Sequence, residues 1–486
     1  MESANNPGEW LLAVVAIAAT SLLIFFGNGL QPRWPLMWFA PVPVLVYALR
    51  SSAWRAGVVA FLGMLLGCLN FWNYLRVLGA PPVAWFASFS LIALMMAGGV
   101  LLTRALARRG AVWSALVALP SWWVSFEYVR NLLWPHGSGG SLAYSQLNFL
   151  PFLQLASLAG PWGVSFVLML FPTGLALALW LWASERGEAL RVLGATVGIL
   201  AAVLIFGAVR LSGHQPGPEV RVGLVSSDVN PGVADPGAPA QRLFEQYGEQ
   251  AQGLIARGAQ VVVMPENRAV IVDPDTAAAD DIFQPIANRT GAVLVIGVNH
   301  VSGQIRHNEA RIYAAGVPVR TYDKEHLLPP FENVFTPGTI RTYFAAPGKD
   351  AGQTWGVAIC KDLDFTDPAR GYGRADVGLL FAPAWDFQVD AFWHGHIAVM
   401  RAVEDGFALV RSAAGGFMTV ADDRGRIVAE RRSNSAPFAT VLATVPAGHD
   451  GTLFQLWGDW FGWFAIALLI AVLAWLALGS RRRLQD

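Results

Sequence analysis

The sequence predicts an integral membrane α-helical bundle of about eight spans with an inserted α/β domain. The chain has 486 residues, of which 54% are apolar and only 14% are charged, a composition too apolar for an ordinary soluble enzyme. Only sixteen charged residues, eleven Arg and five Glu, precede Ser212, and the other fifty-two follow it. Beyond that boundary, short β-branched runs alternate with helical stretches, as in α/β domains.

Seven apolar runs precede the boundary and an eighth closes the chain. Most have close to the roughly 20 residues that a helix needs to cross a bilayer, and the second run is the shortest. The runs cover residues 10–30, 35–49, 53–75, 83–103, 111–132, 162–183, 192–210 and 460–479. The predicted domains are therefore a seven-span domain at 1–211, an inserted domain at 219–448, and a C-terminal helix with a short tail at 456–486.

Positive charge in the short loops orients these spans. Ten Arg residues fall on one side, including the triplet at 481–483, and four fall on the other. Positive loops face the cytoplasm, so both termini are predicted there, and the inserted domain is predicted outside, in the periplasm or its equivalent. The first run is not predicted to be a cleaved signal, because Glu2 and Glu9 replace the usual basic segment and the run is too long.

Charge balance and cysteine count exclude several classes of protein. Thirty-four basic residues cancel thirty-four acidic ones, so no nucleic-acid partner is expected. The two cysteines, Cys68 and Cys360, lie in such different contexts that neither a disulfide nor a structural zinc site is expected. His394 and His396 are two residues apart on a predicted helix and would point apart, which favours a polar helix face or loop over a metal site. We expect no metal and no cofactor.

Two features of the membrane part leave alternatives open. Residues 133–161 are rich in Gly and aromatic residues and nearly uncharged, so they form either an ordered interfacial loop or a loop that shapes a substrate site. Glu127 is the only acid inside an apolar run, and it is either paired structurally with Arg130 or functional. Cys68, inside the third run, is expected to be a packing residue.

The inserted stretch predicts an α/β domain with a mixed sheet. Strands are expected at 220–225, 260–264, 292–298, 354–360 and 377–383, and helices near 239–257, 276–288 and 391–405. Two later runs, FALVRSA and FMTVAD, have hairpin spacing, and Asp423-Arg424-Gly425 has the composition of a turn.

Three residues that can carry chemistry end strands or open loops in this domain. Glu266 follows QVVVMP, Lys324 follows VRTYD, and Cys360 ends TWGVAIC. Each alone has an ordinary explanation, since a Cys closing an apolar strand is usually inert and a Glu or Lys there is usually a solvated charge. Together they form a possible nucleophile, base and oxyanion donor.

Lysine usage points to the same site. Only three of the thirty-four basic residues are Lys, at 324, 349 and 361, so a compact amine is retained where Arg would not serve. A Lys beside a thiol lowers the thiol pKa and can donate to a developing oxyanion, which the wide guanidinium fork of Arg does less readily.

The strings VVVMPEN, TYDKEHLLPPFENV and GVAICKD, in this order, resemble the Glu-Lys-Cys triad of the nitrilase (carbon–nitrogen hydrolase) superfamily. The stretch RAVEDGFALVRSAAGG at 401–416 is similar to a further motif of that superfamily. FEYVRNLLWPHGSGGSLAYSQ at 126–146, LWGDWF at 456–461 and the layout of spans resemble the membrane-embedded branch, the apolipoprotein N-acyltransferase family. The resemblance therefore covers nearly the whole chain.

The resemblance implies a nitrilase-like αββα sandwich and a ping-pong acyl transfer. Cys360 would take a fatty acyl chain from a phospholipid as a thioester and pass it to the N-terminal amine of a diacylglyceryl-cysteine lipoprotein. Glu266 would be the general base and Lys324 the oxyanion donor. Glu332 would support both, and the backbone N–H of Lys361 would complete the oxyanion hole.

Further expectations follow from the same resemblance. The partners would be a phospholipid acyl donor, a lipoprotein acceptor and the membrane, with the protein a monomer in the bacterial inner (plasma) membrane. Trp385 and Phe387, in FAPAWDF, would bind substrate. The family has an aromatic residue and Glu after the nucleophile, where this chain has Lys361 and Asp362, and these differences are expected to affect the pocket more than the triad.

Two other functions remain open from the sequence. A membrane-anchored amidase would keep the triad but resolve the acyl-enzyme with water. A transporter or scaffold would use a nitrilase-like domain only for binding, but transporters carry polar or broken helices near the midplane, and here such residues are few apart from Glu127.

Overall fold

A computed structural model describes residues 7–213, 217–228, 233–347 and 352–482. The chain forms two compact units. The helical unit comprises Met1–Leu133, Gly140–Arg210 and Asp459–Asp486, and the sheet unit comprises Trp134–Gly139 and Leu211–Gly458. Residues 1–6 and 483–486, at the two ends of the chain, lie outside the described residues, and so does Lys349.

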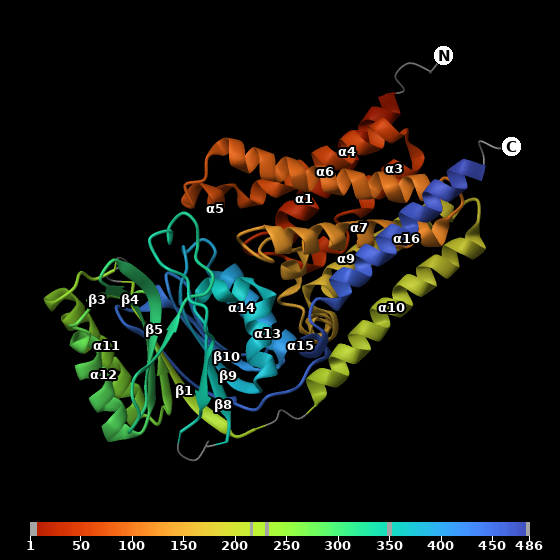
Figure 1. The fold of residues 1–486 in the computed structure, drawn as a ribbon. Helices are drawn as coiled ribbons and strands as arrows, with labels where there is room; N and C mark the ends of the chain where they lie inside the picture. Colours follow the sequence, from red (N-terminus) through yellow and green to blue (C-terminus); the bar gives the residue numbers. More distant parts are fainter. Residues whose placement is uncertain (1–6, 214–216, 229–232, 348–351, 483–486) are drawn as a thin grey trace. The chain divides into compact units, whose positions relative to one another are not determined.

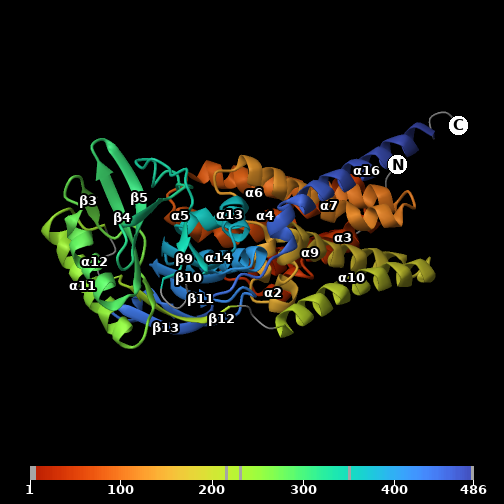
Figure 2. The same ribbon diagram turned by 60° about the horizontal axis from the view of Figure 1, so that its bottom comes forward.

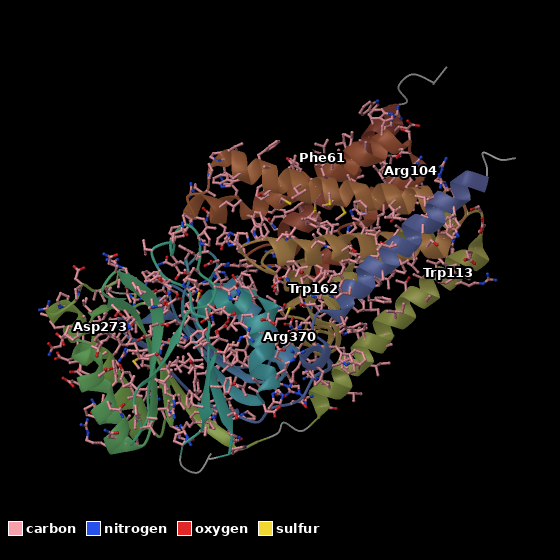
Figure 3. All side chains as sticks on the ribbon, in the orientation of Figure 1. Phe61, Arg104, Trp113, Trp162, Asp273 and Arg370 are labelled. Carbon is pink, nitrogen blue, oxygen red and sulfur yellow. The ribbon has the colours of Figure 1, made fainter. Side chains whose placement is uncertain are left out.

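Six helices of the described chain are long and apolar enough to cross a membrane. The segments are Gly8–Gly27 in α1, Ala53–Val77 in α4, η1 and α5, Pro82–Ala107 in α6, Ala156–Leu181 in α9, Arg186–Ser212 in α10 and Trp460–Leu478 in α16. Figure 1 shows these long helices grouped with one another in the helical unit. Figure 3 labels Trp162 among them, and Trp162 is fully buried.

The other two predicted spans differ from these six. Residues 35–49 form two short helices, α2 (Trp34–Met37) and α3 (Val42–Arg50), on either side of Pro41. The run at 111–132 forms α7 (Val112–Leu133), a helix of 22 residues that contains Pro120 and several polar side chains. Neither meets the length and composition of a membrane-crossing helix among the described residues, so the count of eight remains a prediction.

The loop that follows α7 is ordered around Glu127. The carboxylate of Glu127 accepts hydrogen bonds from Nε1 of Trp123 at 2.9 Å, Oγ of Ser141 at 2.9 Å and the backbone N–H of Leu142 at 2.7 Å. The segment continues into η2 (Leu142–Gln146) and α8 (Leu150–Leu153), and the side chains of η2 are buried. A buried carboxylate with three donors has a sufficient structural explanation as the anchor of this loop.

The sheet unit contains two mixed sheets, seen with their helices in Figures 1 and 2. The first has the strand order β13-β1-β2-β4-β5-β6, with β3 also paired to β4, and the second has the order β12-β11-β10-β9-β8-β7. The strands of the first are β1 (Glu219–Ser226), β2 (Val261–Val263), β3 (Val270–Val272), β4 (Val293–Ser302), β5 (Ile305–Tyr313), β6 (Arg320–Asp323) and β13 (Ala439–Pro446). The strands of the second are β7 (Thr342–Ala345), β8 (Thr354–Val357), β9 (Val377–Trp385), β10 (Ala408–Ala414), β11 (Phe417–Ala421) and β12 (Ile427–Arg432).

Alternation along the strands builds three apolar layers. Val222 and Leu224 of β1 pack with Leu379 and Phe381 of β9 in the core between the sheets. The opposite face of the first sheet packs on α11 (Ala238–Ala256) and α12 (Ala277–Thr290). The opposite face of the second sheet packs on α13 (Thr366–Arg374) and α14 (Ala391–Asp405). The result is a four-layer αββα domain.

The strands that hydropathy predicted form β1, β2, β4, β8 and β9, and the predicted hairpin forms β10 and β11. Strand β5 was not predicted, because Asn308, Glu309 and Arg311 interrupt its apolar pattern. These polar side chains are nonetheless buried, since each has ionic or hydrogen-bonding partners inside the domain.

Candidate active site

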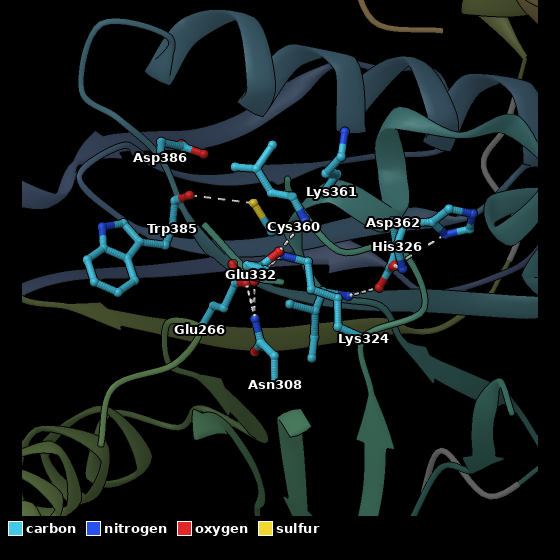
Figure 4. A network of polar contacts seen from close by, with 12 residues as sticks. Glu266, Asn308, Lys324, His326, Glu332, Cys360, Lys361, Asp362, Trp385 and Asp386 are labelled. Atoms are coloured by element: carbon cyan, nitrogen blue, oxygen red, sulfur yellow. Dashed lines mark hydrogen bonds and ion pairs between the residues drawn. The ribbon is translucent and has the colours of Figure 1, made fainter. Parts of the chain in front are cut away.

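Glu266, Lys324 and Cys360 each follow the end of a strand, and Figure 4 shows them converging. Glu266 follows β2 and Lys324 follows β6 in the first sheet, whereas Cys360 follows β8 in the second. The charges of Glu266 and Lys324 both act on the Cys360 thiol. The packing of the two sheets therefore brings together three residues that are distant in the sequence.

The backbone around Glu266 is held closely by the neighbouring strand. The backbone N–H of Gly297 in β4 donates to the carbonyl of Pro265 at 2.9 Å, and the N–H of Arg268 donates to the carbonyl of Gly297 at 2.9 Å. A methyl group at Gly297 would collide with the backbone of Glu266, so only glycine allows this close approach. Asn267 has φ of 53°, which turns the chain immediately after Glu266.

Lys324 binds two carboxylates. Its Nζ donates to Oε1 of Glu266 at 2.7 Å and to Oε1 of Glu332 at 2.9 Å, and it lies 2.8 Å from Oε2 of Glu332. Glu332 is fixed in turn, because its Oε2 accepts the backbone N–H of Leu328 at 2.7 Å. The ammonium is thus oriented by ion pairs on two sides.

Asn308, which the sequence did not indicate, bridges the same two carboxylates. Its Nδ2 donates to Oε1 of Glu266 and to Oε1 of Glu332, both at 2.6 Å, and its side chain is fully buried. We call Glu266, Asn308, Lys324 and Glu332 the triad network. Three of its four carboxylate oxygens accept hydrogen bonds or pair with Lys324, and only Oε2 of Glu266 has no hydrogen-bond partner. That oxygen is the one free to take a proton.

Cys360 occupies an uncommon backbone conformation. Its φ is 42°, in the left-handed region, at the start of the 3-10 helix η4 (Cys360–Asp364). Non-glycine residues in this region are strained and often functional. The thiol donates to the backbone carbonyl of Trp385 at 3.6 Å, so the end of β9 helps to place the sulfur.

Burial and charge set the protonation states of the site. Burial, followed by the carboxylate of Glu266, raises the pKa of the Cys360 thiol to about 12, although Lys324 opposes this. Burial also raises the pKa of Glu266, with Lys324 lowering it and Glu332 raising it. Burial would lower the pKa of Lys324, but Glu266 and Glu332 raise it well above its ordinary value. The thiol is therefore protonated at rest, so its reaction requires a base.

The two residues after Cys360 are turned into the protein. Asp362 is fully buried and accepts from Tyr322 Oη at 2.8 Å, from the backbone N–H of His326 at 2.7 Å and from that of Ile359 at 2.9 Å. Asp362 therefore fastens strand β6 and the loop after it to the turn that carries the nucleophile.

Lys361 is also buried, and its contacts lie away from the triad. Its Nζ lies 3.2 Å from Nδ1 of His136 and 3.4 Å from Oδ2 of Asp364. Ser138 Oγ donates to the carbonyl of Asp364 at 2.5 Å, so residues 134–139 are fastened to η4. The side chain at position 361 is thus part of the support of the nucleophile turn.

The two aromatic residues predicted to bind substrate lie at and just beyond the end of β9. The guanidinium of Arg268 lies over the ring of Trp385, 5.1 Å from its centroid. The ring of Phe387 lies 5.3 Å from that of Phe331, which is half exposed. Trp385 is joined to the site through its backbone carbonyl, and substrate binding by either ring remains a prediction.

Both parts of the chain match a known family. A model described as "Apolipoprotein N-acyltransferase N-terminal domain" matches residues 21–174, and one described as "Carbon-nitrogen hydrolase" matches residues 234–447. Proteins named apolipoprotein N-acyltransferase align along almost the whole chain. The chain belongs to the apolipoprotein N-acyltransferase family.

Individual relatives have moderate sequence identity. The apolipoprotein N-acyltransferase of Geobacter metallireducens is 26% identical, over 98% of this chain and 96% of its own. That of Gloeobacter violaceus is 25% identical, over 92% and 91%. Among solved structures, an amidase from Nesterenkonia sp. AN1 aligns with a TM-score of 0.40 and 20% identity, over 48% of this chain and 94% of its own.

The family membership, together with the six membrane-length helices, identifies an integral membrane protein with a carbon–nitrogen hydrolase domain. The resemblance read from the sequence motifs is thereby confirmed.

His394 and His396 have separate partners, as their spacing predicts. His396 Nδ1 lies 2.8 Å from the carbonyl of Phe392. His394 lies among three aspartates and is largely buried, so its side of the helix is polar but faces the protein interior. Among the described residues, no group of three or more His, Cys, Asp or Glu side chains could hold a metal ion.

Sequence reasoning did not find Asn308 or the aspartates around His394. Asn308 lies in IRHNEARIY, where charged residues conceal a strand. A signal existed for Arg411, because it lies in the motif RSAAGG, but its role as the partner of Asp386 depends on the fold.

Proposed function

We propose that this protein transfers a fatty acyl chain from a phospholipid, through a thioester on Cys360, to the N-terminal amine of a diacylglyceryl-cysteine lipoprotein. The observation that carries the proposal is the triad network beside Cys360. Oε2 of Glu266 has no hydrogen-bond partner and can take a proton, and the ammonium of Lys324 is fixed by the carboxylates of Glu266 and Glu332. Relatives named apolipoprotein N-acyltransferase support the choice of substrates.

The first half-reaction forms the thioester. Glu266 Oε2 removes the proton of the Cys360 thiol, and the sulfur attacks the ester carbonyl carbon of the phospholipid. Lys324 Nζ and the backbone N–H of Lys361, in the first turn of η4, donate to the developing oxyanion. The ester C–O bond breaks, Glu266 returns the proton to the leaving alkoxide, and a lysophospholipid departs.

The second half-reaction resolves the thioester. The neutral N-terminal amine of the lipoprotein attacks the thioester carbonyl, and Glu266 Oε2 accepts one of its protons. The same two donors hold the oxyanion. The C–S bond breaks, an amide forms, and the proton on Glu266 returns to the sulfur of Cys360. Glu332 and Asn308 do not touch the reacting atoms in this scheme and keep Lys324 and Glu266 in place.

We further propose an eight-span arrangement in which α2 with α3 and α7 complete the six membrane-length helices. Both termini would then lie in the cytoplasm and the catalytic domain, residues 219–448, in the periplasm. The partners would be a phospholipid, a lipoprotein and the membrane, with no nucleic acid, and the protein would act as a monomer. A periplasm-dependent reporter should be active after Leu211 and inactive after Asp486, and the opposite pattern would contradict this orientation.

Intact-mass measurement tests the reaction directly. The full-length protein is incubated with phospholipid vesicles, and an acyl group is expected on Cys360 that persists until a diacylglyceryl-cysteine peptide is added. Cys68→Ser should acquire the same group, and Cys360→Ala should not. Absence of an acyl group on Cys360 would overturn the mechanism. An acyl group that disappears in water without acceptor would instead identify a hydrolase.

A further inference from the structure

A second buried ionic group includes the residue that follows Cys360 and the residue that follows Trp385. Its six members have side chains that are at most 9% exposed. They are Lys361, Asp364, Asp386, Asp390, His394 and Arg411, and we call them the histidine cluster. The cluster joins η4, the loop between β9 and α14, the first turn of α14, and β10.

His394 lies at the centre of this cluster. Its Nδ1 is 3.1 Å from Oδ2 of Asp390 and 3.7 Å from Oδ1 of Asp386, and its Nε2 is 3.6 Å from Oδ2 of Asp364. These are ion-pair distances to three carboxylates at once. No other side chain in the cluster is close to all three.

The other two cations of the cluster, Arg411 and Lys361, each pair with one of the aspartates. Arg411 donates to Asp386 through Nη1 at 3.0 Å and Nη2 at 2.6 Å, and Lys361 Nζ lies 3.4 Å from Asp364. Asp390 has no such cation of its own. Its Oδ1 accepts the backbone N–H of Phe387 at 2.8 Å, its Oδ2 lies 3.1 Å from Nδ1 of His394, and its charge also acts on Arg411.

The net charge of the cluster therefore depends on whether the His394 imidazole is protonated. Three carboxylates face Lys361 and Arg411, so the cluster is neutral only when His394 is protonated. A buried carboxylate without a compensating charge is costly, and this cost favours the imidazolium. Burial would lower the pKa of His394, but Asp390 and Asp364 raise it well above its ordinary value. Burial would likewise raise the pKa of Asp386, but Arg411 holds it below its usual range.

The cluster borders the nucleophile on both sides. Lys361 is the next residue after Cys360, and Asp386 follows Trp385, whose carbonyl accepts from the thiol. The charge of Asp386 raises the pKa of the thiol, and that of Arg411 lowers it. Beyond the cluster, the titratable group near His394 is His136, which contacts Lys361. Two charges of the cluster, those of Asp386 and Arg411, therefore act on the sulfur directly.

We propose that His394 is a positioning residue whose positive charge balances Asp364, Asp386 and Asp390, so that no uncompensated negative charge opposes removal of the proton from Cys360. The proposal rests on the proposed role of Cys360 as nucleophile. It assigns to His394 an electrostatic task without contact with substrate.

Alkylation of Cys360 tests the proposal without any lipid. The rate of reaction of the full-length protein with iodoacetamide is measured against pH, with peptide mass spectrometry separating Cys360 from Cys68. His394→Gln leaves one excess negative charge, which disfavours the thiolate, so the alkylation rate at a fixed pH should fall about tenfold, equivalent to an upward move of the midpoint by about one pH unit. His396→Gln, on the same helix but outside the cluster, should keep the midpoint of the unmodified protein.

Two further variants separate charge from structure. His394→Gln combined with Asp390→Asn removes one charge of each sign and should return the midpoint toward that of the unmodified protein. Asp390→Asn alone leaves an excess positive charge and should move the midpoint downward. This variant also decides the matter if His394→Gln does not fold. The proposal would be overturned if the alkylation midpoint of His394→Gln equals that of the unmodified protein, or if the double variant keeps the full shift of His394→Gln. It would also be overturned if the midpoint of Asp390→Asn does not move downward.

The readouts distinguish this proposal from the proposed function. If the unmodified protein acquires no acyl group from phospholipid but the alkylation midpoints move as expected, the acyl-transfer mechanism fails and the role of His394 stands. If acylation occurs and the midpoints do not move, the role of His394 fails alone.

Discussion

The triad network and the histidine cluster flank the same cysteine, but they differ in charge balance. In the triad network one ammonium faces two carboxylates, and Oε2 of Glu266 has no donor. In the histidine cluster three cations face three carboxylates when His394 is protonated. Both groups are buried, so burial alone does not decide what they do.

The difference separates proton chemistry from support. A network with an excess carboxylate and one unoccupied oxygen can gain and lose a proton, which is what a general base requires. A balanced network holds its protons, because loss of either charge leaves its partner buried and uncompensated. We therefore expect substitutions in the triad network to change the rate most, and substitutions in the histidine cluster to change mainly the pH dependence.

The largest effect is expected at the nucleophile itself. Cys360→Ala and Cys360→Ser should abolish acyl transfer, because the first has no nucleophile and the serine hydroxyl is far less acidic than a thiol. Transfer to a diacylglyceryl-cysteine peptide measures the effect, with membrane insertion checked by fractionation. Cys68→Ser, which changes the other cysteine, should retain activity, and turnover by either Cys360 variant would contradict the mechanism.

Next in size is Lys324→Arg, for which we expect a loss of at least about a hundredfold. The charge is kept, but the planar fork replaces a compact donor that two carboxylates orient, and loss of one oxyanion donor typically costs this much. Single-turnover acylation of Cys360 measures it. The same exchange at Lys361, whose ammonium faces Asp364, should have a much smaller effect, and near-normal acylation by Lys324→Arg would show that charge alone suffices.

Asn308→Asp should move the pH dependence of acylation upward by about one unit. The new carboxylate removes a donor to Oε1 of Glu266 and adds a negative charge, and both changes raise the pKa of Glu266 further above its ordinary value. Glu266 must be deprotonated to act as a base, so activity would appear at higher pH. The exposed Asn288→Asp is the control, and a downward shift would show that Glu266 is not the base.

The smallest effect is expected for Lys361→Met. It removes one cation from the histidine cluster, so the midpoint for Cys360 alkylation should rise, but by less than in His394→Gln, because Lys361 pairs with one carboxylate and His394 with three. Acylation at neutral pH should fall only about threefold, equivalent to about half a pH unit. A larger rise than in His394→Gln would place the control of the cluster at Lys361.

The two residues after Cys360 differ from those of the family, and the structure shows contacts of their side chains that the sequence did not predict. Lys361 and Asp362 replace an aromatic residue and Glu, and both side chains are buried in support of η4. Substrate selection at these positions remains a prediction. Restoring the family-like residues at 361 and 362 and comparing the two half-reactions would test it.

The sequence alone determined the membrane character, the composition boundary near Ser212 and the three reactive residue types. Each of these depends on local composition or on a short motif, and such signals survive without knowledge of the fold. Strands β1, β2, β4, β8 and β9 were also predictable, because they are buried on both faces and read as continuous apolar runs.

Only the tertiary structure decided how charge is distributed around Cys360. Asn308 bridges Glu266 and Glu332, and His394 faces aspartates that come from two other segments. Polar residues in a sequence predict exposure, and they are buried only where distant partners neutralise them. The partners here lie on strands and loops of two sheets, so their pairing follows from the packing of those sheets rather than from any spacing along the chain.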